Sequence, residues 1–443
     1  MVYKNKLIET IRYQVDAVTA SPVSIKGDDD NLKIDSITGK FYIPGSSIAG
    51  AFRNYFEKYI KVNDTRKNVL FGDQELGMNR IVFYDAFTVD NSIRKMLLSR
   101  PGIRIDRRKL SGVYKFSMGK KVGSKFRRLF VNDGIRFLFV FELNNYDENC
   151  DFSLIQDQFE QLLSAFARGD ILLGNNKTVG FGRFKINSVH RTAFNFMDYN
   201  DVIKYLLKET KKVEDITESI LNRKSIPGNI RFVIKARTAT PLLIKDEVVR
   251  SAGEPDGVNI KNGSDEYVLP GSSLKGALRS RAEKLAKTFP YIDWALVTNI
   301  FGAESDKEED AHISRLICYD TIIKNSKTGL YNKIKIDYFT GGVQQHALMT
   351  EETVMGELDI ECVFNTFGLK NYDKEIGILL LIFRDLCTEN LNIGGGYAVG
   401  RGYIRAETLE LLIDGRRIIY DFQSPDKKTE DKFNSYISKL TMR

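Results

Sequence analysis

Apolar and polar positions alternate near the start of the chain. Single polar residues separate an apolar set that consists of Ile11, Tyr13, Val15 and Ala17. A period of two is typical of a half-buried strand, so residues 11–17 are predicted to form the first strand of a sheet. A loop rich in aspartate leads from there to Pro44-Gly45, and a helix is predicted to begin at this turn. Its apolar side is formed by Phe52, Tyr55, Phe56 and Ile60.

Further strands and a second helix follow in a regular order. Residues 80–85 and the alternating phenylalanines of residues 137–141 predict two strands. Apolar residues at helical spacing predict a second helix from about Asp151, and Gly169 is a suitable C-terminal stop. Residues 184–189 predict a last strand. The order strand-helix-strand-strand-helix-strand is the ferredoxin-like plan, with a four-stranded antiparallel sheet and two helices on one face.

The same pattern occurs twice. Residues 42–53 read YIPGSSIAGAFR, and residues 268–279 read VLPGSSLKGALR. The second copy has a predicted strand at 230–236, a helix from about residue 272, strands at 315–321 and 353–364, and a helix at 376–386. We therefore expect an α+β protein of two tandem ferredoxin-like (RRM-like) domains. The predicted boundaries are 1–190 for the first domain, 191–228 for a helical connector, and 229–443 for the second domain with a C-terminal tail.

Composition narrows the function. The 443 residues carry a formal net charge of +8 with a pI near 9.0, which favours a polyanionic partner, nucleic acid before an anionic membrane surface. Charge interrupts every apolar run, and the N-terminus lacks a signal-peptide core, so we expect a cytoplasmic protein that does not enter a membrane. The four cysteines and three histidines are scattered, which argues against structural zinc and a disulfide framework.

The repeated Pro-Gly-Ser-Ser segment opens a helix in both copies. Free N–H groups and the helix dipole attract phosphate at such an end, and serine hydroxyls add donors. In a single copy a simple turn and cap would be the better interpretation, but repetition of the whole segment weakens it. The candidate RNA-binding residues of this motif and of the helices behind it are Ser46, Ser47, Arg53, Ser272, Ser273, Lys275 and Arg279.

Two glycine-rich stretches, residues 174–183 and 394–403, precede the last strand of each copy. They lack the Gly-Lys-Ser/Thr ending of a nucleotide P-loop. Their backbone amides could bind an anion, with Arg183 and Arg401 beside them. The alternative is a connection that only lets sheet and helix pack closely.

The segment 100–128 is strongly basic, and aromatic residues are interleaved with the cations. Basic side chains neutralise phosphates while aromatic rings stack on unpaired bases, so this mixture favours single-stranded nucleic acid over the alternative of a solvated charged loop. The candidate contacts are Arg104, Arg107, Arg108 and Lys109. Residues 333–355 of the second copy are nearly neutral, so the two domains need not hold RNA equally.

Together these motifs resemble the backbone subunit of type III CRISPR effector complexes, in the RAMP superfamily, with two such units fused. The matching segments of the first copy are 35–39 (DSITG), 43–47 (IPGSS), 70–72 (LFG), 105–107 (IDR) and 180–183 (GFGR). Those of the second copy are 269–273 (LPGSS), 300–302 (IFG), 336–337 (ID), 340–342 (TGG) and 400–402 (GRG). The resemblance implies guide RNA, complementary target RNA and other subunits of a type III complex as partners. It also implies that segment 100–128 is a thumb-like insertion that displaces bases.

The resemblance further implies target-RNA cleavage by a metal-dependent carboxylate in the loop before the capped helix. Counting back from Pro-Gly-Ser-Ser places Asp29 there in the first copy, with Asp28 and Asp30 as neighbours that could exchange roles. Asp256 is the match in the second copy, with Glu254 as the fallback. Asp29 and Asp256 would each hold Mg²⁺ or Mn²⁺ weakly, shared with an RNA phosphate.

Three other functions compete with this one. A scaffold subunit would make the same RNA contacts without cleavage. Relatives that process guide-RNA precursors use a histidine near the first helix, whereas this chain has none before His190. An ordinary RNA-recognition domain is disfavoured because residues 136–141 lack the Lys/Arg-Gly-Phe/Tyr opening of its central-strand signature.

Overall fold

The computed structural model divides into two compact units. Unit 1 comprises Met1–Leu98, Phe130–Lys177 and Phe181–Pro227, and unit 2 comprises Ser99–Leu129, Thr178–Gly180 and Gly228–Arg443. The two segments Ser99–Leu129 and Thr178–Gly180 come from the first sequence repeat and are grouped with unit 2. The structure describes residues 6–26, 32–60, 70–71, 79–89, 97–103, 105–106, 111–117, 120–123, 125–146, 151–209, 211–224, 228–246, 254–303, 312–344 and 347–441.

Unit 1 is built on an antiparallel sheet. Its long strands are β1 (Glu9–Thr19), β11 (Arg136–Asn145) and β12 (Phe184–Asn195), and β1 lies between the other two. The shorter strands β3 (Ile81–Phe83) and β4 (Ala86–Thr88) pair with β11, β2 (Tyr42–Ile43) pairs with β4, and β13 (Glu214–Asp215) pairs with β12. The sequence order across the sheet is thus fourth, first, third, second, as the ferredoxin-like plan requires.

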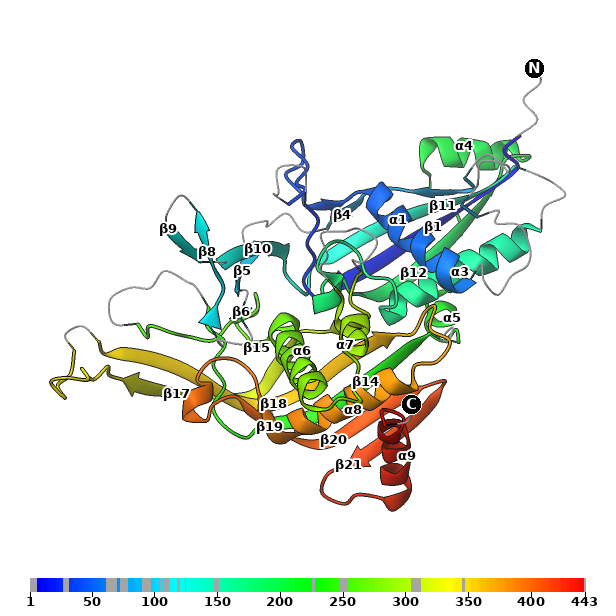
Figure 1. Ribbon diagram of the computed structural model, residues 1–443. Coiled ribbons are helices and arrows are strands. Elements are labelled where there is room, and N and C mark those ends of the chain that lie inside the picture. The colour runs from blue at the N-terminus through cyan, green and yellow to red at the C-terminus, as the bar shows by residue number, and fades with distance from the viewer. Residues whose placement is uncertain are drawn as a thin grey trace. The chain divides into compact units, whose positions relative to one another are not determined.

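Two helices pack on this sheet. They are α1 (Gly45–Tyr55), which continues as a π-helical turn over Phe56–Ile60, and α3 (Phe152–Arg168) (Figure 1). The predicted inward residues of β1 are buried, and the rings of Phe52 and Phe166 join the two helices at 5.5 Å. Asp151 caps α3 and Gly169 ends it in the left-handed region at φ 78°, as predicted. The fold class expected from the sequence is confirmed.

The connector between the repeats holds α4 (Tyr199–Leu207) and α5 (Thr217–Leu221). α4 is fixed to the sheet of unit 1 by polar contacts, because the hydroxyl of Tyr205 donates to Glu142 at 3.0 Å. The same carboxylate forms an ion pair with Arg12 at 2.7 Å. Glu142 is buried, so these donors offset the cost of removing its charge from water.

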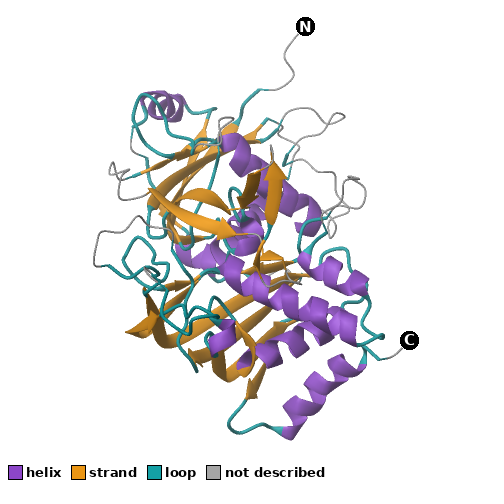
Figure 2. Ribbon diagram, turned by 60° about the vertical axis from the view of Figure 1, so that its left-hand side comes forward, coloured by secondary structure: helices purple, strands orange, loops and turns teal. Residues whose placement is uncertain are grey.

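Unit 2 repeats the sheet with longer strands. β14 (Asn229–Thr238) lies between β18 (Met349–Asn365) and β20 (Tyr403–Ile413), and β16 (Leu316–Cys318) and β17 (Thr321–Lys333) pair with β18. β15 (Val268–Leu269), β19 (Thr388–Asn392) and β21 (Arg416–Asp421) complete it. The helices are α6 (Gly271–Thr288), α7 (Trp294–Phe301) and α8 (Asp373–Cys387), and Figure 2 shows helices and strands of the chain in separate colours.

The C-terminal tail adds one more helix, which the sequence patterns had not predicted. α9 (Lys427–Ser438) packs against α8 so closely that a Cβ on Gly377 would lie 2.6 Å from the carbonyl oxygen of Tyr436. Across the described helices, none is long and apolar enough to cross a membrane.

Each repeat also sends a β-hairpin away from its sheet. In the first repeat β5 (Leu97–Ile103) pairs with β10 (Lys125–Val131), and the short strands β6 (Ile105–Asp106), β7 (Ser111–Gly112), β8 (Tyr114–Ser117) and β9 (Lys120–Gly123) form two smaller hairpins between them. In the second repeat β17 and β18 themselves extend beyond the sheet (Figure 1). The described residues of the basic segment 100–128 therefore lie mainly in β-hairpins.

Candidate functional site

At the start of each helix behind a Pro-Gly-Ser-Ser motif, an aspartate carboxylate accepts from the first backbone N–H, and no serine caps the helix. The N–H of Gly45 donates to Asp85 Oδ1 at 2.7 Å, and the N–H of Gly271 donates to Asp320 Oδ1 at 2.8 Å. Pro44 and Pro270 occupy the N-cap positions. Neither helix has a side-chain cap from a motif serine, because Asp85 and Asp320, each between two strands distant in sequence, supply the anion that the helix end attracts.

The motif serines are nevertheless partly accessible. Ser46 and Ser47 are exposed, whereas Ser272 and Ser273 are half-buried. Since Asp85 and Asp320 already place negative charge at the two helix ends, a phosphate there would meet a carboxylate as well as donors. RNA contact by these serines stays a prediction, and the structure gives it little electrostatic support.

Most basic residues of these helices have partners within the protein. Arg53 pairs with Glu57 at 2.8 Å and Arg279 pairs with Glu283 at 3.0 Å. Lys275 donates to the carbonyl oxygen of Thr178 at 3.1 Å. Desolvation lowers the pKa of Lys275 to about 8. Of these residues, Arg53 is the one whose side chain is mostly exposed.

The glycine-rich turns pack backbone against backbone. The N–H of Gly182 donates to the Pro22 carbonyl at 2.8 Å, and the N–H of Gly402 donates to the Pro241 carbonyl at 3.0 Å. Both glycines have positive φ, and a Cβ on Gly402 would lie 2.0 Å from the Ile393 carbonyl oxygen. Close packing, the alternative considered from the sequence, explains these two glycines. Beside the first turn, the Arg183 side chain is half-buried.

Several predicted residues lie outside the described part of the chain. They are Asp28, Asp29, Asp30, Arg104, Arg107, Arg108 and Lys109. Within the described part of the same hairpin, the Arg128 guanidinium lies 4.7 Å from the ring centre of Phe126, whose side chain is 44% exposed. Arg100 is buried and forms an ion pair with Asp320.

Asp256, the predicted catalytic residue of the second repeat, lies in a loop tied to the edge of β18. Its Oδ2 accepts from the N–H of Thr350 at 2.7 Å. The N–H of Gly257 donates to the Thr350 carbonyl at 3.2 Å, and the N–H of Glu352 donates to the Gly257 carbonyl at 2.7 Å. Asp256 is exposed, whereas Gly257 is buried. The backbone thus fixes an accessible carboxylate near the outer end of the β17–β18 ladder, where the loop 334–348 begins. Its fallback, Glu254, is also exposed.

A charged cluster that the sequence analysis had not predicted lies next to this loop. We call it the Glu351 cluster; it consists of Glu351, Lys245, Lys333 and Arg401. Glu351 pairs with Lys245 at 2.7 Å, with Lys333 at 2.5 Å and with Arg401 at 2.7 Å. Burial alone would raise the pKa of Glu351, but hydrogen bonds from the three cations lower it to about 2. Arg401 is therefore buried against a carboxylate and does not present its guanidinium to solvent.

A single carboxylate fits a weakly held magnesium ion. Mg²⁺ keeps several waters and commonly takes its remaining ligands from substrate phosphates. Among the residues that the structure describes, no group of three or more His, Cys, Asp or Glu side chains could hold a metal. Asp256 could supply one carboxylate ligand to such an ion.

The outer end of the second hairpin is aromatic and exposed. Tyr338 and Phe339 are 93% and 92% exposed, with ring centres 5.6 Å apart. Asp337 holds the turn by accepting from the N–H groups of Phe339 and Thr340 at 3.0 and 2.9 Å. Such rings are available to stack on unpaired bases.

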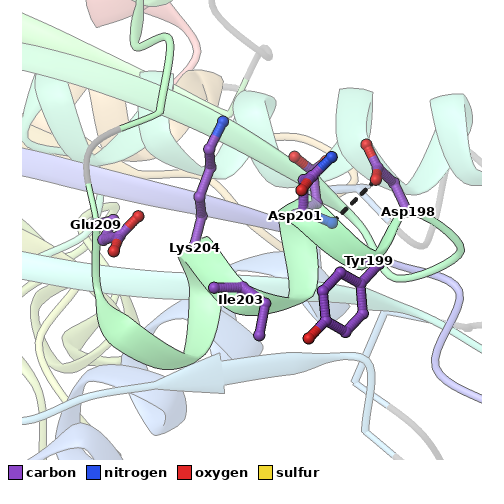
Figure 3. Close-up of a pocket in the computed structure, with 7 residues that line it drawn as sticks. Asp198, Tyr199, Asp201, Ile203, Lys204 and Glu209 are labelled. Carbon is purple, nitrogen blue, oxygen red and sulfur yellow. Dashed lines mark hydrogen bonds between the residues drawn. The ribbon is translucent and has the colours of Figure 1, made fainter.

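A pocket of about 500 Å³ along α4 is unrelated to these residues (Figure 3). Asp198 is used there as the cap of α4, and Asp201 accepts from the N–H of Asn195 at 2.9 Å and pairs with Lys211. The polar groups of the pocket therefore serve the connector. Its lining consists of Asp198, Tyr199, Asn200, Asp201, Ile203, Lys204 and Glu209.

Two comparisons bear on identity. The family model of the RAMP superfamily matches residues 16–185 and again residues 235–405, which together exceed half of the chain. The search among curated proteins finds no match.

Proposed function

The chain belongs to the RAMP superfamily, with two tandem units, and from this premise we propose that it is a fused double backbone subunit of a type III CRISPR ribonucleoprotein. In this proposal the chain binds guide RNA, associates with other subunits, and cleaves complementary target RNA at up to two sites, in the cytoplasm. The observation that carries the catalytic part is Asp256, an exposed carboxylate that Thr350 fixes near the start of the loop 334–348, which carries the exposed rings of Tyr338 and Phe339. Asp29 would be its counterpart in the first repeat.

The geometry supports a division of labour in the second repeat. Tyr338 and Phe339 would stack on displaced bases and so unstack the RNA near the hairpin. The Thr350 N–H holds one oxygen of Asp256, so the carboxylate keeps its orientation when RNA arrives. Asp256 would hold Mg²⁺ against an RNA phosphate, and the ion would stabilise negative charge that develops there.

The proposed reaction uses the RNA's own nucleophile. The 2′-oxygen attacks the adjacent phosphorus as the bond from phosphorus to the 5′-oxygen breaks. The 2′-hydroxyl proton passes to solvent, and solvent protonates the leaving 5′-oxygen. The products would be a 2′,3′-cyclic phosphate and a 5′-hydroxyl. Hydrolysis by water would instead leave no cyclic phosphate, so the ends of the products test the route.

A non-catalytic scaffold is the second candidate, and precursor processing is a weaker third. Asp256 accepts a hydrogen bond from the Thr350 N–H. The same bond would also serve a carboxylate that only anchors the loop, and this favours the scaffold. The cleavage assay on the variants described below distinguishes the scaffold from the nuclease.

The test is Mg²⁺-dependent cleavage of end-labelled complementary RNA by the guide-loaded complex. It compares the wild type with Asp29→Ala, Asp256→Ala and the double variant, and Asp431→Ala on α9 serves as an exposed control carboxylate. Each single change should remove a different product, and the control should remove none. If all assembled variants cut alike, or none including the wild type cuts, the catalytic proposal fails and the scaffold remains.

A further inference from the structure

The Glu351 cluster carries more positive charge than its carboxylate can neutralise. Three cations contact one carboxylate, each within 2.7 Å. Arg401 needs that carboxylate because its side chain is only 8% exposed. Lys245 and Lys333 are 45% and 38% exposed, so their ammonium groups remain open to a second ligand. Each ammonium has three donors, and the bond to Glu351 uses one of them.

The two lysines also lie next to the candidate catalytic loop. A Cβ on Gly257 would be 3.3 Å from Lys245 Nζ, so this ammonium lies directly against the residue that follows Asp256. Lys333 ends β17 opposite Met349, one residue before Thr350, whose N–H holds Asp256. An anion bound between the lysines would therefore lie beside the Asp256 carboxylate.

An exposed ring adjoins the same cluster. The guanidinium of Arg401 lies 4.6 Å from the ring centre of Tyr331, and Tyr331 is 41% exposed. Tyr331 pairs directly with Glu351 across the two strands. A base stacked on the open face of this ring would belong to the nucleotide whose phosphate meets the lysines.

The fold does not require this cluster. Gly182 in the first repeat corresponds to Gly402 in the second. The residue before Gly182 is Phe181, where the second repeat has Arg401. The Phe181 ring packs edge-on against Phe130, with ring centres 5.4 Å apart. Both phenylalanines are buried. An apolar pair is thus sufficient at this turn, and buried ion pairs seldom stabilise more than an apolar replacement. The charged version in the second repeat calls for another explanation.

We infer that Lys245 and Lys333 bind one backbone phosphate of single-stranded RNA beside Asp256, and that Tyr331 stacks on the adjoining base. This inference rests on the proposed RNA-binding function, and it deepens that function by assigning a phosphate site. Glu351 is the positioning residue, because it holds both ammonium groups at one place.

The test is the salt dependence of single-stranded RNA binding by the full chain. The variants are Lys245→Met, Lys333→Met and the double change, which remove charge and keep the apolar stems. Each phosphate neutralised on a single strand contributes about 0.7 to the slope of log affinity against log salt, so the double variant, which loses one phosphate site, should lose about 0.7. Lys245→Arg with Lys333→Arg should retain the slope. Lys324→Met is the control, since Lys324 lies on the same strand, is 56% exposed and is also ion-paired, with Asp359.

The outcomes separate this inference from the proposed function. If the wild type binds RNA and the double variant keeps the full slope, the phosphate site is refuted while the function stands. A lower unfolding midpoint with an unchanged slope would show that the lysines are only structural. If the slope falls but the guide-loaded wild type does not cleave RNA, the phosphate site is supported and the catalytic proposal fails. A wild type that binds no RNA overturns both.

Discussion

Replacing Glu351 by Gln should strongly destabilise unit 2 at neutral pH. The change keeps the shape of the side chain and removes the charge that faces Lys245, Lys333 and Arg401. The two lysines can turn to water, so each of their pairs is worth about 0.2 to 1 kcal/mol. Arg401 cannot, and breaking a buried pair by removing one partner costs about 3 to 5 kcal/mol. We therefore expect the free energy of unfolding to fall by about 3 to 5 kcal/mol.

The assay is urea unfolding followed by tryptophan fluorescence. The chain contains one tryptophan, Trp294, and it lies on α7 in unit 2. Its signal thus follows the unfolding of unit 2, which matters because two units need not unfold in one step. The midpoint should fall for Glu351→Gln with an unchanged slope against urea.

A double variant supplies the decisive control. Glu351→Leu combined with Arg401→Phe replaces the buried ion pair by apolar side chains, with phenylalanine at the position of Phe181 in the first repeat, and leaves no buried charge. Its stability should lie within about 1 kcal/mol of the wild type or above it. If Glu351→Gln costs less than about 1 kcal/mol, or if the double variant is as unstable as the single one, the description of a buried charge held by Arg401 is wrong.

The pH dependence gives an independent check of the same pair. The folded-state pKa of Glu351, about 2, lies below its ordinary value of 4.5. The stabilisation is therefore complete above pH 4.5 and is lost as the pH falls from 4.5 towards 2. The difference between wild type and Glu351→Gln should shrink over that window, and a constant difference would contradict the assignment.

Two further substitutions, Gly402→Ala and Lys275→Met, test the glycine-rich turn next to Arg401 and the amine of Lys275. Gly402→Ala should lower the urea midpoint of unit 2 markedly, because φ is 82° and the new Cβ would lie 2.0 Å from a carbonyl oxygen. Gly400→Ala, at φ 73° with open space around it, should cost only about 1 to 2 kcal/mol, and equal costs would refute the close-approach argument. Lys275 has a folded-state pKa of about 8 against an ordinary 10.5, so the unfolded state binds more protons between these values and the stability of unit 2 should rise from pH 8 to 10.5. Lys275→Met should remove that rise in the Trp294 unfolding midpoint, and an unchanged rise would assign it to another group.

The regular elements could be predicted because their signals are local. The alternation of Tyr13 and Val15 with polar residues is the direct consequence of one buried face, and both side chains are fully buried. Asp151 and Gly169 lie at the two ends of α3, where caps act on their nearest turns. The order of these elements along the chain was then sufficient to predict the ferredoxin-like fold.

The helix starts were predicted at the right places, but the carboxylates that hold them were not predicted because they are remote in sequence. Gly45 is held by Asp85 and Gly271 by Asp320, separations of 40 and 49 residues along the chain. A signal did exist, since a Tyr-Asp pair ends the following strand segment in both repeats, at residues 84–85 and 319–320. Comparing the repeats with each other, rather than each with general capping preferences, would have found it.

The Glu351 cluster shows why charge counted along a segment can mislead. Residues 333–355 are nearly neutral in sequence, and on that ground the two domains were not expected to hold RNA equally. Folding brings Lys245 and Arg401 from distant segments to Glu351, so the local balance becomes three cations against one carboxylate. Electrostatic attraction depends on distance in space, within about a Debye length of 8 to 10 Å, and not on position in the chain. The phosphate site that we infer near the outer end of the β17–β18 ladder is therefore compatible with a hairpin sequence that carries little net charge.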